Sequence, residues 1–328
     1  MRISSQSLPL SLQPEAEHVT EVHDALLAWY AAEQRPLPWR ITRDPYAILV
    51  SEVMLQQTQV DRVLPKYAQF LAAFPTLADL AAASVAEVIT VWAPLGYNRR
   101  AVNLQAIAQQ VMREYEGRIP DTIDELLKLK GVGRYTAGAI ACFAYRKQVA
   151  TVDTNIRRVL HRIFLGLEHP EPKVNDAQML ILAEQVLPEQ RAYDWNQALM
   201  DMGATTCTSN NPQCTDCSVQ QTCQAYKDMG QHSLFPSGSV LRQLRKVAEK
   251  KPGYQAQPFT NSNRYFRGRI VDLLRSLPTP NSRLSLVELG PKIKPTFTSE
   301  DLPWLQKVVN GLQRDGLLDV NEDGVRLP

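Results

Sequence analysis

The sequence predicts a mostly helical protein that ends in a small module of helices and a hairpin. Apolar residues recur at helical spacing from residue 21 to about residue 230, and the alternation typical of strands is nearly absent before residue 280. Pro75, Gly96, Pro120 and Pro170 separate the helical segments. Two β-capable runs around residues 321–324 give a hairpin signal near the end of the chain. The predicted fold class is therefore all-α with a small α+β C-terminal module.

Composition limits the classes of protein that need to be considered. The 328 residues suggest two or more domains, and 44% hydrophobic with 21% charged residues is typical of globular proteins. The formal net charge is only +2, so nucleic-acid binding has to be argued from local patches. We expect no membrane span and no targeting peptide, because the N-terminus resembles none and apolar runs are short. The expected compartment is the cytosol, or a nucleus if the source has one.

The helical body follows a regular order. After a mobile N-terminus (residues 1–17), a helix over residues 21–33 leads into a rigid turn at residues 35–40. We expect Asp44 to cap the next helix and Pro45 to occupy its first position. Further helices are expected over residues 60–73, 77–82, 85–92, 100–115, 122–129, 134–146, 154–164, 175–187 and 193–204.

Two segments follow the helical body. Residues 238–262 are typical of a basic linker, with five lysines and arginines against one glutamate between residues 240 and 251. Residues 263–328 contain expected helices over 264–276 and 300–315, and then the hairpin. This order predicts a winged-helix-like module.

A glycine-rich turn joins two of the expected helices. Gly131 and Gly133 permit the tight turn, and the helix starting at Arg134 would point backbone N–H groups and its positive dipole end outward. Such a turn binds phosphate, and an acid, Asp153, follows a short distance downstream. A phosphate-holding turn beside a carboxylate suggests chemistry on a nucleic-acid strand. The alternative is an ordinary helical hairpin with a capping aspartate.

Four of the five cysteines lie within one short segment. Cys207, Cys214, Cys217 and Cys223 are separated by six, two and five residues. Clustered thiols in a reducing compartment point to metal, and the irregular spacing with a single Cys-x2-Cys knuckle favours an iron–sulfur cluster over zinc. The cluster need not be catalytic, because it can fix a loop. Cys142 is expected in the core.

These elements together resemble the helix-hairpin-helix DNA glycosylases of the endonuclease III superfamily, and within it most closely the MutY family of adenine glycosylases. The resemblance implies a six-helix barrel domain over residues 46–149, an iron–sulfur helical domain over 18–45 with 150–232, and a [4Fe-4S] cluster on the four cysteines. It covers about residues 20–225 and is carried by Leu37–Arg40, Ser51–Val60, Leu95–Tyr97, Gly131–Ile140, Val152–Leu160, Asn196–Ala204 and the cysteines.

The resemblance implies a pair of catalytic acids. Glu52 matches the general acid that protonates the departing adenine, and its apolar helical context would raise its pKa. Asp153 matches the acid that stabilises or captures C1′ of the sugar, and Asn155 and Tyr135 match supporting residues. Endonuclease III-type enzymes carry a lysine at the place of Tyr135, and a phenol cannot form the Schiff base. We therefore expect base removal without β-lyase activity. The alternative for Glu52 is an exposed helix glutamate.

The resemblance also implies contacts with a double-stranded DNA that contains a mismatch or an oxidised base. Gln56 and Gln57 resemble the wedge that fills the gap left by the flipped base, and Tyr97 is expected to intercalate beside the orphan base. The alternative for Tyr97 is packing in the core. The residues expected to contact DNA are Gln56, Gln57, Tyr97, Lys130, Gly131, Gly133 and Arg134.

Departures from the family pattern leave the substrate open. The C-terminal region does not resemble the Nudix-like reader of 8-oxoguanine, and it is expected to bind DNA or a protein partner, or to serve as a packing module. The main expectation is a monomeric, nucleoid-associated or nuclear enzyme of base excision repair that removes adenine opposite G or 8-oxoguanine. The alternatives are a thymine or uracil mismatch glycosylase and a non-catalytic binder of damaged DNA. Retention of Glu52, Asp153 and Asn155 argues against the last of these.

Overall fold

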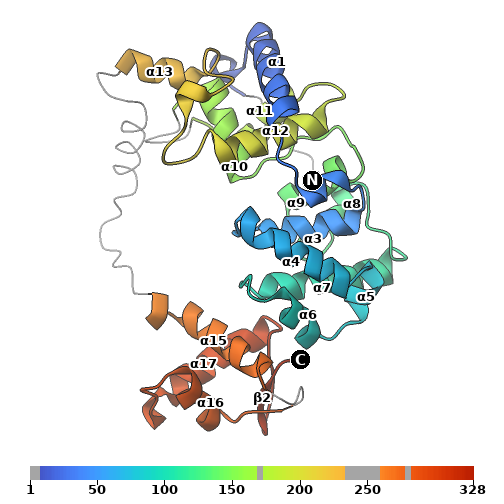
Figure 1. Cartoon of the computed structure of the whole chain (residues 1–328), viewed down its shortest axis with the longest axis vertical. Coiled ribbons are helices and arrows are strands. Elements are labelled where there is room, and N and C mark those ends of the chain that lie inside the picture. Colours follow the sequence, from blue (N-terminus) through green and yellow to red (C-terminus); the bar gives the residue numbers. More distant parts are fainter. Residues whose placement is uncertain (1–7, 168–172, 233–258, 278–281) are drawn as a thin grey trace. The chain divides into compact units, whose positions relative to one another are not determined.

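The computed structural model describes residues 8–167, 173–232, 259–277 and 282–328 (Figure 1). The chain divides into two compact units, and each is built from two separate segments of sequence. The first unit takes residues 1–43 and 133–254, and the second takes residues 44–132 and 255–328. No helix among the described residues combines the length and the apolar character that a membrane crossing requires.

Helices of the first unit pack around one apolar core. The apolar positions Val22, Leu26 and Tyr30 recur at helical spacing, so one face of the first helix is buried in that core. Trp195 and Met202, at 1% exposed each, fill it from the helix that packs opposite. The elements are α1 (Ala16–Glu33), α2 (Pro38–Ile41), α9 (Arg134–Phe143), α10 (Thr154–Leu160), a π-helical turn (His161–Leu165), α11 (Asp176–Gln185), α12 (Ala192–Thr205) and α13 (Gln224–His232).

A fully buried helix forms the centre of the second unit. Residues Tyr46 to Met54 of that helix are all buried, which is typical of a helix enclosed on every side. Asp44 caps it by accepting a hydrogen bond from the N–H of Tyr46 at 3.0 Å, and Pro45 is its first residue. The helices are α3 (Pro45–Leu55), α4 (Val60–Ala73), α5 (Leu77–Ala82), α6 (Val85–Trp92), α7 (Arg99–Glu114), α8 (Ile123–Leu126), α15 (Asn263–Arg275), α16 (Leu286–Ile293) and α17 (Leu302–Arg314).

The C-terminal helices and hairpin share a core with α6 and α7 of the same unit. Ile89 belongs to the apolar cluster that contains Leu305 and Leu312, and the N–H of Ala86 donates to the carbonyl of Pro328 at 2.9 Å. Strands β1 (Asp319–Asn321) and β2 (Gly324–Arg326) pair antiparallel, and β2 also makes a bridge through Val325 to residue 284. The module is therefore packed against the preceding helices by apolar surface.

The structure confirms the fold class and most expected helices, and it differs from the expectation at several places along the chain. Residues 8–17 are ordered where the sequence predicted a mobile segment, because Leu8 is 1% exposed and buried in the first unit's core. The rigid turn at 35–40 contains the start of the short helix α2. Helix α9 groups with the first unit, although the predicted domain boundary lay at residue 149, because Asn196 of α12 binds Cys142 and Val149. Residues 240–251 of the predicted basic linker lie outside the described residues.

Candidate active site and cysteine centre

Glu52 lies inside the second unit on the buried helix α3. Its side chain is 4% exposed, so the exposed-glutamate alternative is wrong. It lies between Ser51 and Val53, which are also buried, and the Ser51 hydroxyl donates to the carbonyl of Ile48 at 2.8 Å. The structure therefore places the Glu52 carboxyl group inside the helical core of the second unit, away from bulk solvent.

An arginine fastens the C-terminal end of α3. Arg100 of α7 donates to the carbonyls of Val53 at 3.1 Å and Met54 at 2.9 Å, and also to that of Gln56. Gln56 and Gln57 beyond this point are exposed, and Gln57 has a left-handed backbone with φ of 54°. The two predicted wedge residues therefore stand on an anchored turn directly after the helix that carries the predicted acid.

Tyr97 is a surface residue of the second unit. Its side chain is 43% exposed, so the core-packing alternative is wrong. Its backbone is left-handed, with φ of 49°, which is uncommon for a residue other than glycine. The guanidinium of Arg100 lies 5.3 Å from the ring centroid and that of Arg264 lies 4.2 Å from it. An aromatic ring that is 43% exposed, with two cations near it, is available for contact with a base.

The glycine turn has the conformation that the sequence predicts. Gly131 has a φ of 90°, and a Cβ there would lie 3.4 Å from the side chain of Asn103. Gly133 occupies the N-cap position of α9, in extended backbone. Lys130, Gly131, Gly133 and Arg134 are all exposed, so the turn presents backbone and cations to solvent.

Asp153 caps α10 and borders a cavity of the first unit. Its carboxylate accepts from the N–H of Ile156 at 2.7 Å and from the Asn155 amide at 3.4 Å. Burial raises the pKa of Asp153 above its ordinary value, although the N–H groups of Ile156 and Asn155 and the charge of Arg158 oppose the shift. The cavity has a volume of about 420 Å³, and Asp153 shares its wall with Tyr135 and other residues of α9 and α10.

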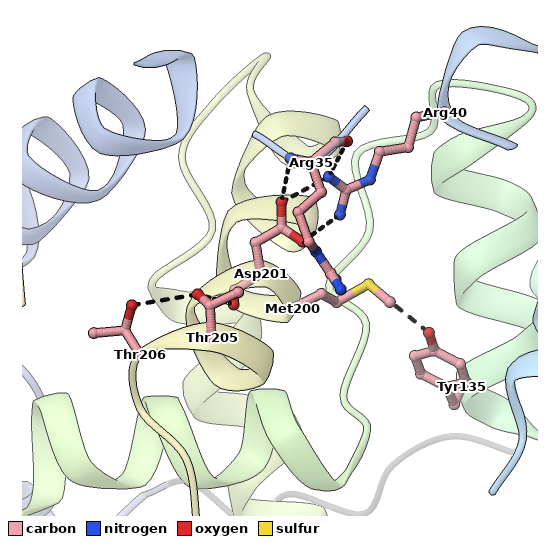
Figure 2. Close-up of polar contacts among 7 residues, drawn as sticks. All are labelled: Arg35, Arg40, Tyr135, Met200, Asp201, Thr205 and Thr206. Carbon is pink, nitrogen blue, oxygen red and sulfur yellow. Dashed lines mark hydrogen bonds and ion pairs between the residues drawn. The ribbon is translucent and has the colours of Figure 1, made fainter. Parts of the chain in front are cut away.

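Tyr135 is held at the start of α9. Its hydroxyl lies 3.9 Å from the sulfur of Met200 on α12, a contact that Figure 2 shows. The structure therefore brings Tyr135 and Asp153 beside one cavity of the first unit, with Asn155 hydrogen-bonded to Asp153, whereas Glu52 belongs to the other unit. The pairing of Glu52 with Asp153 stays a prediction.

A buried ionic triad, which sequence reasoning missed, ties the N-terminal segment to α12 (Figure 2). Asp201, 1% exposed, accepts two hydrogen bonds from Arg40, at 2.6 and 2.7 Å, and two from Arg35, at 2.5 Å from its side chain and at 3.2 Å from its backbone N–H. Burial would raise the pKa of Asp201, but the hydrogen bonds and charge of Arg40 and the charge of Arg35 hold it below the ordinary value. Arg40 and Asp201 each lie in a segment that carried the family resemblance, and this was the only signal in the sequence that could have pointed to the triad.

Two further buried arginines connect α10 to the loop that carries the cysteines. Arg158 donates to the carbonyl of Cys207 at 2.8 Å, to that of Gly203 at 2.7 Å and to the Asn155 side chain at 3.0 Å. Arg162 donates to the carbonyl of Thr208 at 2.8 Å. The helix that begins at Asp153 is therefore bound to the start of the cysteine segment. Arg158 and Arg162 are four residues apart and precede the cysteines in the chain, and this spacing was the sequence signal for a shared contact with the cysteine loop.

The four clustered cysteines line one small cavity in the first unit. Cys207, Cys214, Cys217 and Cys223 all border it, together with apolar residues. Burial raises the pKa of Cys217 to about 11 and that of Cys223 to about 12, so thiolates there require a positive partner. Among the described residues no group of three or more His, Cys, Asp or Glu is arranged to hold a metal ion. The convergence of four sulfurs on one cavity fits a cluster of several iron atoms, which is larger than an ion.

Comparison with known proteins finds relatives among enzymes of DNA repair. A model of the HhH-GPD superfamily of base excision DNA repair proteins matches residues 50–183. The adenine DNA glycosylase of Mycolicibacterium smegmatis is 36% identical over 306 residues, with 91% of this chain and 93% of that protein covered. The human adenine DNA glycosylase is 43% identical over 235 residues, with 69% of this chain and 43% of the human protein covered.

Solved structures agree on the fold. A thermostable thymine-DNA glycosylase matches with a TM-score of 0.61 and 31% identity, covering 65% of this chain and 98% of that one. A non-covalent endonuclease III–DNA complex matches with a TM-score of 0.57 and 22% identity, covering 65% of this chain and 96% of that one. The sequence relatives and the matched family model together identify the lineage: the chain belongs to the adenine DNA glycosylase family, within the HhH-GPD superfamily of base excision DNA repair proteins.

Proposed function

We propose that the protein is a monofunctional DNA glycosylase that hydrolyses the N-glycosidic bond of an adenine mispaired with G or 8-oxoguanine. It acts as a monomer on duplex DNA. The observation that carries the proposal is the set of acids: Glu52 is buried in α3, and Asp153 borders a cavity with Tyr135. Glycosidic bond cleavage of this kind uses a pair of carboxyl groups, one to protonate the leaving group and one to act on the sugar.

Glu52 is the proposed general acid. Adenine leaves as a neutral base only if its ring is protonated as the bond to C1′ breaks, and positioned proton transfer contributes about 10²- to 10⁴-fold in rate. Glu52 is 4% exposed, so its carboxyl group is shielded from bulk solvent. After the base has left, the resulting carboxylate accepts a proton from the attacking water.

Asp153 is the proposed stabiliser of the sugar. Departure of the base leaves positive charge on C1′, which a fixed negative charge offsets. Burial raises the pKa of this carboxyl, and the N–H of Ile156, the amide of Asn155 and the charge of Arg158 oppose that shift by stabilising the ionised form. Asn155 keeps the carboxylate oriented through its own hydrogen bond with it.

Tyr135 limits the reaction to base removal. Cleavage of the strand by β-elimination begins when an amine attacks C1′ and forms a Schiff base, and a phenol cannot form one. The Tyr135 hydroxyl instead contacts Met200. The product is therefore an abasic site in an intact strand.

The exposed glycine turn and the wedge residues supply the proposed DNA contacts. Gly131, Gly133 and the first N–H groups of α9 bind a phosphate, with Lys130 and Arg134 adding charge. Gln56 and Gln57, on the turn after α3, fill the space of the flipped adenine, and the ring of Tyr97 intercalates beside the orphan base.

The four cysteines are the proposed ligands of a [4Fe-4S] cluster. They line one cavity next to the end of α12, and Arg158 and Arg162 bind the loop on which the first of them stands. The cluster would fix this loop and, through it, the start of α10. No step of base removal passes through it.

A second candidate function is excision of thymine or uracil from a mismatch with G. It is favoured by the 31% identity and the TM-score of 0.61 to a thymine-DNA glycosylase structure. The two functions differ in the base released, so a direct assay separates them.

The test is single-turnover base release from four duplexes that contain A:8-oxoguanine, A:G, T:G and U:G. We expect adenine release from the first two and no strand cleavage before alkali treatment. Glu52→Gln should lose about 10²-fold or more of the rate, because it removes the proton that general acid catalysis supplies. Release of only thymine or uracil would replace the proposal with the second candidate. Release of no base would refute both.

A further inference from the structure

The Tyr97 loop and helix α15 of the C-terminal module enclose a large cleft within the second unit. Its volume is about 770 Å³, and its walls come from residues 93–103 on one side and from α15 and the end of α17 on the other. Six arginines line it, against two aspartates. A cleft with this excess of positive charge attracts an anionic ligand.

The two aspartates are already neutralised by arginines of the cleft. Asp315 pairs with Arg267 and, at 3.4 Å, with Arg99, while Asp272 pairs with Arg275 at 2.9 Å. The acids therefore do not compete for the remaining cations.

Two of the other arginines that line the cleft, Arg62 and Arg264, contact the Tyr97 loop. Among the described residues, Arg62 and Arg264 have no carboxylate within ion-pair distance, and both are exposed. Arg62 donates one hydrogen bond to the carbonyl of Pro94 at 3.1 Å, and Arg264 lies over the Tyr97 ring at 4.2 Å. Burial lowers the pKa of Arg100 to about 10, and the positive charge of Arg62 also contributes to this lowering. The cleft thus holds positive charge that nothing described in the protein offsets.

The start of α15 adds a second attraction for anions. Arg264 is the second residue of this 13-residue helix, and Ser262 caps the helix by accepting from the N–H of Tyr265 at 3.2 Å. Arg264 therefore stands in the first turn of α15, where the positive end of the helix dipole adds to its charge.

We propose that this cleft binds the phosphodiester backbone of the strand opposite the excised base, with Arg264 and Arg62 as its phosphate ligands. The inference rests on the proposed action on duplex DNA. Tyr97 is the residue expected beside the orphan base, so the backbone that follows that base enters the cleft next to it. Arg264 then exchanges its contact with the Tyr97 ring for a phosphate, which frees one face of the ring for stacking on a base.

This assignment gives the C-terminal module a role in DNA binding. The module shares an apolar core with α6, so Arg264 is held next to the Tyr97 loop without a ligand. Preorganised cations lose little entropy on binding, and each phosphate contact contributes to the salt dependence of affinity.

The experiment measures the affinity of the full-length protein for a duplex with a non-hydrolysable 2′-fluoro-adenosine opposite 8-oxoguanine, over a range of salt concentrations. Arg264→Ala should reduce the slope of log K against log salt by about 1, and Arg62→Ala combined with it by about 2. Arg264→Lys keeps the charge and should restore most of the slope. Arg314→Ala, an exposed arginine on α17 that does not line the cleft, is the matched control and should leave the slope unchanged.

Neutral methylphosphonate linkages, introduced one at a time into either strand, identify the strand that is bound. A methylphosphonate at one position of the opposite strand should weaken DNA binding by the wild type. The same linkage should not further weaken DNA binding by Arg264→Ala. An unchanged slope for Arg264→Ala, an equal change for Arg314→Ala, or sensitivity only on the adenine strand would overturn the inference. Because the duplex is not cleaved, failure of the proposed base-release activity would appear separately in the single-turnover assay.

Discussion

Asp153 combines a structural contact and a proposed chemical role in one carboxyl group. Its oxygen caps α10 through the N–H of Ile156, and its charge is the proposed counterpart of C1′. Asparagine has the same shape and keeps an oxygen that can accept the capping hydrogen bond, but it carries no charge. Substitution by asparagine and by alanine therefore separates the two roles.

Asp153→Asn should keep the free energy of unfolding within about 0.5 kcal/mol of the wild type, because asparagine caps helices as well as aspartate. The rate of base release should fall by about 10²-fold or more, because the fixed negative charge is lost. Asp153→Ala should show the same loss of rate and an additional loss of about 0.5–2 kcal/mol in stability. Urea unfolding and single-turnover kinetics check both. A fully active Asp153→Asn would contradict the proposed role.

Asp201 should make stability depend on pH. The pKa of Asp201 in the folded state is below the ordinary value of 3.8. Its contribution to the free energy of unfolding is therefore fully present above the unfolded-state pKa, and it is lost as the pH falls through the folded-state pKa. Asp201→Asn leaves two cations without a buried counterion and should cost roughly 3–5 kcal/mol at neutral pH. The difference between wild type and variant in urea unfolding should shrink below pH 3.8. A difference that does not change with pH would show that packing, not charge, sets the cost.

The burial or exposure of a single side chain was predictable from the sequence where its neighbours in the chain were informative. Glu52 stands within an apolar helical run, and Tyr97 follows a glycine in a loop, so burial of one and exposure of the other agree with their predicted roles. The partners of Asp201 were not predictable, because Arg40 lies 161 positions earlier in the chain. Periodicity and spacing describe neighbours in sequence, and they contain no information about such distant contacts.

At the level of elements, α10 and α12 approach so closely that they leave no room for a side chain at one position. A Cβ at Gly203 would lie 2.9 Å from the Cβ of Asn155 and 3.3 Å from the side chain of Val159. The first of these atoms cannot rotate away. The position of Asn155, and with it the start of α10, therefore depends on glycine in the facing helix.

Gly203→Ala should destabilise the protein by about 1–3 kcal/mol, because overpacking forces α10 and α12 apart. It should also slow base release, since the displacement reaches Asn155 beside Asp153. Gly230→Ala is the matched control: it lies in helix α13, where a Cβ would meet nothing within 4 Å. There, alanine should stabilise by about 0.5–1 kcal/mol. If Gly203→Ala behaves like the control in thermal unfolding, the close approach of the helices is not a constraint.

The existence of helices was easier to predict than their ends. The hairpin followed from the turn residues at 321–324, and the capped start of α3 followed from Asp44 and Pro45. The π-helical turn at His161–Leu165, which replaces the end of the helix predicted over 154–164, could not be read from the pattern. The turn has an i to i+5 hydrogen bond, from the N–H of Gly166 to the carbonyl of His161. The spacing of apolar residues in the sequence does not reveal it.

For the whole molecule, the two units should respond differently to loss of iron. The cysteine cavity and the arginines that bind its loop all lie in the first unit. Chelation of iron under reducing conditions should therefore increase amide hydrogen exchange in α10 and α12, because the loop anchoring them is released. Helices α3 and α7 of the second unit should keep their protection. Equal loss of protection in both units would show that they unfold together, and no change would refute a structural cluster.

The construction of each unit from two distant segments has a consequence for synthesis on the ribosome. Arg40 leaves the ribosome 161 residues before its partner Asp201, which corresponds to roughly 8–30 s at about 5–20 residues per second. During that interval the apolar face of α1 has no α12 to cover it. The nascent chain should therefore engage chaperones such as trigger factor or Hsp70 until α12 emerges. Slowing translation between residues 44 and 201 would lengthen this vulnerable period and lower the yield of folded protein.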